Sequence, residues 1–375
     1  MDKIRLGDIA TLINGDRGKN YPSQADITDE GDIPFVNAGH LNGRSIDFEE
    51  MNYISQDKFN RLNSGKFVKG DVLYCLRGSL GKKAIVNDDV EGAIASSLVI
   101  IRPDYNRIDG EYLLFSLDSP SIKEQLIKAN NGSSQPNLSA ASVREYQIEL
   151  PDMKVQKDVV NKLTKVRTII DSRQHEIDLL DELIKARFVE LFGDPVDNPK
   201  GWRMKKLQEL VSDDCTISYG IVQTGDDQEE GIPVFRPVDI VNHVPIRSEL
   251  KKTTEEISNK YKRTILKGRE MLITVRANIA DTCIVGEEFA GCNVGRGIVP
   301  IRTNEDEMIL EFLKHQIDSK HLNDNIKALA KGITLIQLNM EDLREISLIV
   351  PPLEQQKAYV EFAKQVDKSK FLNVA

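Results

Sequence analysis

The side chains of this sequence that are best suited to chemistry lie in turns after β-like runs of apolar residues. Arg77 follows the run VLYCL, and Arg276 follows a similar run 199 positions later. Arginine forms paired hydrogen bonds with the edge of guanine, and asparagine does so with adenine. These turns are therefore suited to contact nucleic-acid bases, or they are solvated, salt-bridged hairpin turns. The candidates are Arg77, Ser79, Lys82, Lys83, Arg276 and Asn278.

Two polar loops offer a second set of base-binding groups. The segments NGSSQPNLS and KGITLIQLN place Gln135, Asn137 and Gln337 before short helices. Their side chains can contact a base, but such loops also cap the helix that follows, and Ser139 or Asn339 would serve as an N-cap.

Three further basic residues, Arg44, Arg296 and Lys331, are candidates for contacts with phosphates. Trp202 follows Gly201. We interpret it as a core residue or an anchor, and not as a platform for base stacking.

No constellation of residues indicates catalysis. The sequence has no GxxxxGK[ST] phosphate loop, no GxSxG elbow and no GxGxxG after a strand. It also lacks the Asn-Pro-Pro-aromatic motif of adenine methyltransferases and a clear nuclease carboxylate–lysine cluster. No metal-ligand spacing is found among His40, His175, His243, His315 and His321. We expect a binding protein that holds neither a metal nor a cofactor.

The elements that must position these residues come from an internal duplication. The segment IPFVN at 33–37 corresponds to IPVFR at 232–236, and YLLFSLDS at 112–119 to FLKHQIDS at 312–319. Arg77 aligns with Arg276, whereas Lys82 and Lys83 align with Asp281 and Thr282. Two domains that bind different base sequences need such differences at equivalent positions.

Each copy predicts an α+β domain. Short β-like runs separated by Gly, Asn and Asp come first, and helical stretches follow at 111–129 and 308–329. The polar loop, a short helix and a last strand, YQIELP or ISLIVP, complete each copy. We place the domains at 1–150 and 194–350.

A long helix is predicted between the copies, because no Pro or Gly interrupts Met153 to Phe192. Forty residues make a rod of roughly 60 Å. Gly193 then supplies a stop. Apolar residues recur in steps of three and four, which is typical of a coiled-coil seam and less so of an ordinary amphipathic core helix. The seam consists of Val159, Leu163, Val166, Ile170, Ile177, Leu180, Ile184 and Leu191. Arg173 and Arg187 lie on it and either pair across it or extend along its edge.

The second copy begins a matching helix at 351–375, where Tyr359, Ala363 and Val366 occupy the positions of Val159, Leu163 and Val166. This helix is shorter than its partner at 151–193. We therefore expect half of the seam to be bare and an apolar patch to lie between Ile177 and Leu191. Either the chain is naturally truncated, or a second copy of it covers this patch.

Composition favours a folded protein. The chain has 375 residues, 40% of them hydrophobic, and a formal net charge of −9. That charge counts against sequence-blind nucleic-acid binding, but not against local basic patches. Neither a signal peptide nor an apolar membrane span is visible, so we expect a cytoplasmic protein with reduced cysteines.

The order of these segments resembles the specificity subunits of type I restriction–modification systems. The resemblance rests on KGDVL with GSLGK downstream, GSSQPNLS, LFGDPVDNPKGW, LPDMKVQKDVV and VPPLEQQKAYV, and it covers nearly the whole chain. It implies two target-recognition domains related by pseudo-two-fold symmetry and separated by long antiparallel coiled-coil helices.

The resemblance also implies a role without catalysis. Each domain would bind one part of a split DNA target, and the helices would dock two methyltransferase subunits, with restriction subunits joining the complex. S-adenosylmethionine and ATP would belong to those partners. The other hypothesis from the sequence is a coiled-coil scaffold without DNA recognition.

Overall fold

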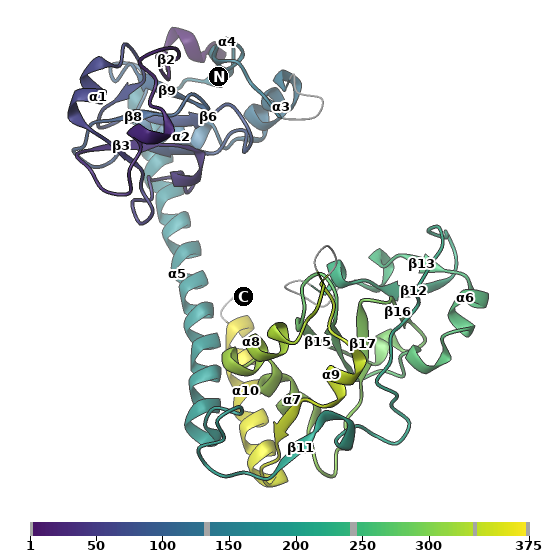
Figure 1. The fold of residues 1–375 in the computed structure, drawn as a ribbon. Helices are drawn as coiled ribbons and strands as arrows, with labels where there is room; N and C mark the ends of the chain where they lie inside the picture. Colours follow the sequence, from purple (N-terminus) through teal and green to yellow (C-terminus); the bar gives the residue numbers. More distant parts are fainter. Residues whose placement is uncertain (1–2, 131–135, 241–245, 333–335, 373–375) are drawn as a thin grey trace. The chain divides into compact units, whose positions relative to one another are not determined.

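The computed structural model describes residues 3–130, 136–240, 246–332 and 336–372. They form two compact units, Met1–Ser172 and Arg173–Ala375. The division falls within the 40-residue helix α5 (Met153–Phe192), whose bounds are those predicted from the sequence. Figure 1 shows α5 as one unbroken helix. Gly193 follows it with a left-handed φ of 75°, as expected of a helix stop.

The first unit contains three sheets. Their strand orders are β2-β9-β6-β7, β4-β3-β8-β5 and β1-β10. Its strands are β1 (Lys3–Arg5), β2 (Ala10–Asn14), β3 (Ile33–Val36), β4 (Tyr53–Ile54), β5 (Lys66–Phe67), β6 (Val72–Cys75), β7 (Lys83–Ile85), β8 (Gly92–Ile94), β9 (Leu98–Pro103) and β10 (Gln147–Glu149). Its helices besides α5 are α1 (Gln56–Arg61), α2 (Gly110–Ser116), α3 (Pro120–Ala129) and α4 (Ala140–Arg144).

The second unit repeats this plan with smaller sheets, ordered β15-β14-β17, β13-β12-β16 and β11-β18. Its strands are β11 (Met204–Lys206), β12 (Ile232–Phe235), β13 (Lys252–Thr253), β14 (Glu270–Thr274), β15 (Thr282–Val285), β16 (Asn293–Val294), β17 (Ile298–Ile301) and β18 (Ser347–Ile349). Its helices are α6 (Glu255–Asn259), α7 (Leu310–Ile317), α8 (Lys320–Ala328), α9 (Met340–Arg344) and α10 (Leu353–Leu372). The α+β class is confirmed. None of the helices in the described ranges is long and apolar enough to cross a membrane.

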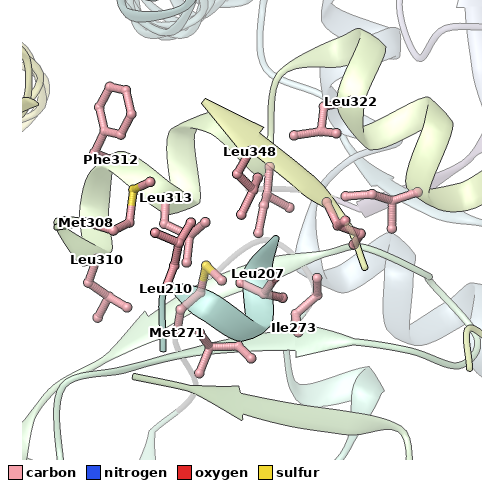
Figure 2. Close-up of a cluster of buried hydrophobic side chains, with 14 of the residues drawn as sticks. Leu207, Leu210, Met271, Ile273, Met308, Leu310, Phe312, Leu313, Leu322 and Leu348 are labelled. Carbon is pink, nitrogen blue, oxygen red and sulfur yellow. The ribbon is translucent and has the colours of Figure 1, made fainter. Parts of the chain in front are cut away.

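The central strands of each unit are apolar on both faces because each face covers a separate core. In β6, Val72 and Tyr74 point into one buried cluster, and Leu73 and Cys75 into another. In β14 the same alternation places Met271 and Ile273 in the larger core of the second unit. Figure 2 shows that core, in which side chains from this sheet, α7, α8 and β18 meet.

Each helical stretch predicted as one segment is two helices in the structure. In the first unit the break precedes Pro120, the first residue of α3, and the Ser119 side chain accepts from Ile122 N–H to cap that helix. The second unit breaks at Asp318–Ser319, between α7 and α8. Proline is favoured in the first turn of a helix because its missing N–H is not needed there, but it cannot continue a preceding one.

A buried glutamine fastens the first turn of each long helix to its unit. Gln156 accepts from Asp109 N–H at 2.9 Å and donates to the carbonyls of Arg107 and Pro151. Gln356 makes the same three hydrogen bonds 200 positions later, to Ile309, Glu307 and Pro351. The duplication therefore extends to individual hydrogen bonds.

The prediction that the seam is bare between Ile177 and Leu191 is wrong. Within the second unit α10 runs antiparallel to the end of α5, since Tyr359 packs on Phe188 and Phe192 while Lys370 pairs with Asp181. Ile184 is consequently buried, and Leu180 and Leu191 pack against the same core. Because α10 starts beside the C-terminal end of α5, it covers that end first. The exposed apolar residues of α5 include Leu163, Val166, Ile169 and Ile170 in the first unit.

The seam also changes its spacing. Ile184, Phe188 and Phe192 are the buried positions at the end of α5, in steps of four. A helix with 3.6 residues per turn drifts away from a strict seven-residue repeat, which explains why Phe188 replaces Arg187 on this face. Arg187 pairs with Glu190 and lies over the ring of Phe362, while Arg173 pairs with Glu176.

Candidate nucleic-acid interface

The turns singled out in the sequence are the tips of two equivalent β-hairpins. Strands β6 and β7 enclose residues 76–82, the first tip, and β14 and β15 enclose residues 275–281, the second tip. In the first tip, Cys75 N–H donates to the Lys82 carbonyl and Gly81 N–H to the Cys75 carbonyl. In the second, Thr274 and Asp281, and Ala280 and Thr274, form the same two bonds.

Both tips contain two residues in the left-handed region, at matching positions. In the first tip they are Gly78 and Gly81, with φ of 78° and 77°. In the second they are Ala277 and Ala280, with φ of 60° and 66°. Alanine costs roughly 1 kcal/mol or more in this conformation, whereas glycine adopts it freely. The second tip therefore keeps the backbone of the first in spite of strain.

The structure joins each tip to the polar loop predicted as a separate candidate. Arg77 forms an isolated β-bridge with Asn137, and Arg276 forms one with Gln337. Leu138 N–H donates to the carbonyl of Leu76 at 2.8 Å, and Leu338 makes the equivalent bond to Val275. The backbones of the arginine and of the amide residue are therefore adjacent in each unit. Gln135 lies outside the described residues.

In the second unit the arginine side chain is held in place. Nε and Nη2 of Arg276 both donate to Oε1 of Gln337, and Nε2 of Gln337 lies 2.6 Å from the hydroxyl of Tyr219, to which it donates. Burial and the neighbouring Arg296 cation lower the pKa of Arg276. Tyr219 is a residue that the sequence analysis missed, since neither its type nor its position predicted a role.

In the first unit the arginine is free of such support. Arg77 is exposed, and in the part of the chain that the structure describes its guanidinium has no hydrogen bond or ion pair. Ser79 and, in the second tip, Asn278 are exposed as well. These side chains are available to a partner.

The two lysines of the first tip differ from each other. Lys83 lies in β7 with only 6% of its side chain exposed, and it is paired with Asp118. This contradicts its prediction as a DNA contact, because the ammonium group is already engaged. Lys82 is half-buried, reaches the carbonyl of Gly39 at 3.4 Å and lines a polar cavity of about 480 Å³ beside the tip.

The remaining basic candidates have different surroundings. Arg44 pairs with Glu111 and lies over the ring of Phe115, so it too is engaged. Lys331 pairs with Asp342. Arg296 is exposed and makes no ion pair among the described residues.

Two of the alternatives from the sequence are settled. Ser139 caps α4 by accepting from Ser142 N–H, which confirms the capping interpretation for that residue. Trp202 donates from its indole N–H to the Phe192 carbonyl at 3.0 Å and packs on the Phe192 ring, so it is an anchor at the end of α5.

One group of potential metal ligands was not visible in the sequence. His321 Nδ1 lies 3.2 Å from Asp194 and 3.9 Å from Asp197. Asp194 Oδ1 also accepts from two backbone N–H groups of its own turn. A polar contact between the segment after α5 and α8 accounts for this geometry.

The comparisons with known proteins define the class. The family model described as "Type I restriction modification DNA specificity domain" matches residues 1–182 and 199–373. The chain belongs to this family and carries its domain twice. It is the DNA sequence-specificity subunit of a type I restriction–modification complex, and it is not itself the enzyme.

Relatives and solved structures are similar over most of the chain. The putative type I restriction enzyme MjaX specificity subunit of Methanocaldococcus jannaschii is 24% identical, covering 89% of this chain and 80% of that one. A type I S subunit from M. genitalium shares the fold with a TM-score of 0.55 and 14% identity, covering 99% of this chain and 90% of that one. A structure from a study of complex assembly in a type I system has a TM-score of 0.54 and 20% identity, with 99% and 91% covered.

Proposed function

We propose that each unit binds one part of a split duplex-DNA target through its tip and the polar loop beside it. The observation that carries this proposal is the duplicated bridge that joins Arg77 to Asn137 and Arg276 to Gln337. Equal backbones present side chains to DNA in the same way, and different side chains at equivalent positions select different bases. Lys82 and its counterpart Asp281 even differ in the sign of their charge.

The long helices serve the partners in this proposal. Leu163, Val166, Ile169 and Ile170 are exposed on α5, with Ile169 at 62%. An apolar stretch on a single helix suits the burial of a partner surface, and we assign it to a methyltransferase subunit. The second such subunit would use the helices of the second unit. S-adenosylmethionine and ATP would be held by the partner subunits.

Methylome sequencing tests the DNA part of the proposal. The chain is co-expressed with its methyltransferase subunit in a host that lacks both genes. The expected result is methylation at a sequence of two specified parts with unspecified bases between them. An uninterrupted motif, or a stable complex that methylates no defined sequence, would refute this and favour the scaffold hypothesis.

Charge placed on α5 tests the docking part. Replacing Val166 and Ile170 by glutamate should weaken binding of the methyltransferase subunit at least about tenfold, because both partners lose apolar burial. Asn161→Glu adds a charge to the same exposed helix without removing an apolar side chain and should leave binding unchanged. Equal binding by the double variant and the control would exclude this surface.

A further inference from the structure

The second tip holds its arginine in a way that leaves one defined edge of the guanidinium open. Gln337 accepts from Nε and Nη2 of Arg276, and this uses the side edge of the group. The terminal edge, formed by Nη1 and Nη2, has no acceptor among the described residues. An arginine presents a pair of parallel donors on that edge.

The acceptor is itself fixed. Because Gln337 Nε2 donates to the Tyr219 hydroxyl, the amide cannot rotate without losing one of its bonds. Tyr219 is in turn placed by the close approach of its neighbour Gly220 to β16, where a Cβ would lie 2.0 Å from the Val294 carbonyl oxygen. A chain of contacts therefore runs from the sheet to the guanidinium.

Arg276 lies near a second cation, Arg296, and this local positive charge suits an electron-rich ligand. Burial and the positive charge of nearby Arg296 lower the pKa of Arg276, and the Cβ of Arg276 would lie 3.4 Å from a Cβ at Gly297, the neighbour of Arg296. Neither arginine makes an ion pair within the described ranges, although the chain carries a net charge of −9. Two neighbouring cations without a carboxylate repel each other unless an electron-rich partner binds. The O6 and N7 atoms of guanine match the open edge of Arg276, and a backbone phosphate matches Arg296.

We propose that Arg276 is a specificity-determining residue that recognises one guanine in the half of the target bound by the second unit. Gln337 and Tyr219 are its positioning residues, and Arg296 binds an adjacent phosphate. This inference rests on the proposed function and adds to it the base, the edge of the guanidinium and the supporting residues. A side chain fixed before binding loses less conformational freedom on binding, which sharpens discrimination between bases.

The test is the methylome of the complex of the full chain with its methyltransferase subunit. Arg276→Lys keeps the charge but not the paired donors. It should relax one guanine position in one half of the motif, with discrimination there falling about 5- to 150-fold, the effect of one bidentate base contact. The other half should stay unchanged. Tyr219→Phe removes only the hydroxyl and should relax the same position more weakly.

Two matched variants separate base recognition from charge and from folding. Arg263→Lys changes an exposed arginine of the second unit that lies outside the tip and the polar loop, and it should leave the motif unchanged. Arg77→Lys should act only on the other half. An unchanged motif for Arg276→Lys would overturn the inference, as would loss of methylation at all sites equally. If the unaltered complex gives no two-part motif, the proposed function itself fails, and that outcome is distinct from both.

Discussion

The two tips share a backbone and differ in how they support their arginines. In the first unit Arg77 projects from a glycine-containing turn, and the shorter Asn137 beside it gives no acceptor to its guanidinium in the described residues. In the second, Arg276 is bound by Gln337 on a turn with two strained alanines. The comparison shows that the duplicated backbone places the two arginines alike. Gln337, held by Tyr219, gives Arg276 an acceptor that Asn137 does not give Arg77 among the described residues.

The largest expected effect tests a feature that the two units share, the buried glutamine at the start of each long helix. Gln156→Met or Gln356→Met keeps the shape of a fully buried side chain but leaves one N–H and two carbonyls without a partner. Each variant should lower the free energy of unfolding of its unit by about 3 kcal/mol. Denaturant unfolding measures the loss. The control Gln174→Met, on the exposed face of α5, should change stability by less than about 0.5 kcal/mol. Clearly unequal losses at the two glutamines would show that the equivalence is only apparent.

A difference between the units appears at His315, whose counterpart is Phe115. Burial lowers the pKa of His315 to about 4, with Lys314 acting in the same direction and Asp318, Asp367 and Glu311 opposing it. In the unfolded chain the imidazole takes up its proton near pH 6.5. Between these values the unfolded state binds more protons, so stability falls as the pH falls from about 6.5 toward 4, by roughly 3 kcal/mol at most.

His315→Phe gives the second unit the residue of the first and should remove this part of the pH dependence. The measurement is the denaturant midpoint of both proteins between pH 7 and 4. Carboxylates titrate in both proteins alike, so only the difference between the two curves counts. Parallel curves would mean that His315 is protonated as easily in the folded state as in the unfolded chain.

The smallest expected effect tests the strain in the tips. Ala277 is exposed with φ of 60°, and a Cβ on Gly78 would meet nothing within 4 Å. The effect of a substitution at either position therefore comes from the backbone conformation and not from lost or new side-chain contacts. Ala277→Gly should stabilise the second unit by about 1 kcal/mol, and Gly78→Ala should destabilise the first by about the same amount. Thermal unfolding of the two variants should show shifts of opposite sign; shifts of the same sign would contradict the equivalence of the tips.

Much of this arrangement was predictable because it depends on local or repeated features. The bounds of α5 follow from an uninterrupted helical sequence, and the alignment of Arg77 with Arg276 follows from the repeat. The sequence predicted contacts with DNA from both the turn and the polar loop, but it did not show that the two lie side by side. Their proximity depends on a hydrogen bond between residues about 60 positions apart.

The errors have equally specific causes. The bare part of the seam was misplaced because Tyr359, Ala363 and Val366 are equivalent to Val159, Leu163 and Val166 in the repeat but do not show which part of α5 is covered. In the antiparallel arrangement α10 packs on the C-terminal end of α5. Lys83 looked available because it was assigned to the turn after the first β-like run, but it lies in β7, where strand alternation turns it toward Asp118. Tyr219 was missed because its role depends on the close approach of Gly220 to β16, and nothing in the local sequence reports that approach.

The equal length of the two tips has a consequence for the evolution of the protein. Each tip is closed by the same two main-chain hydrogen bonds within its hairpin. Each also accepts a hydrogen bond from the backbone N–H of a leucine in the polar loop, Leu138 or Leu338. A segment of this kind can be exchanged between copies, or with a homologous gene, without altering the residues that enclose it. Under the proposed function, recombination confined to so few codons would change the recognition sequence and leave unchanged the helices to which we assign the docking of partner subunits.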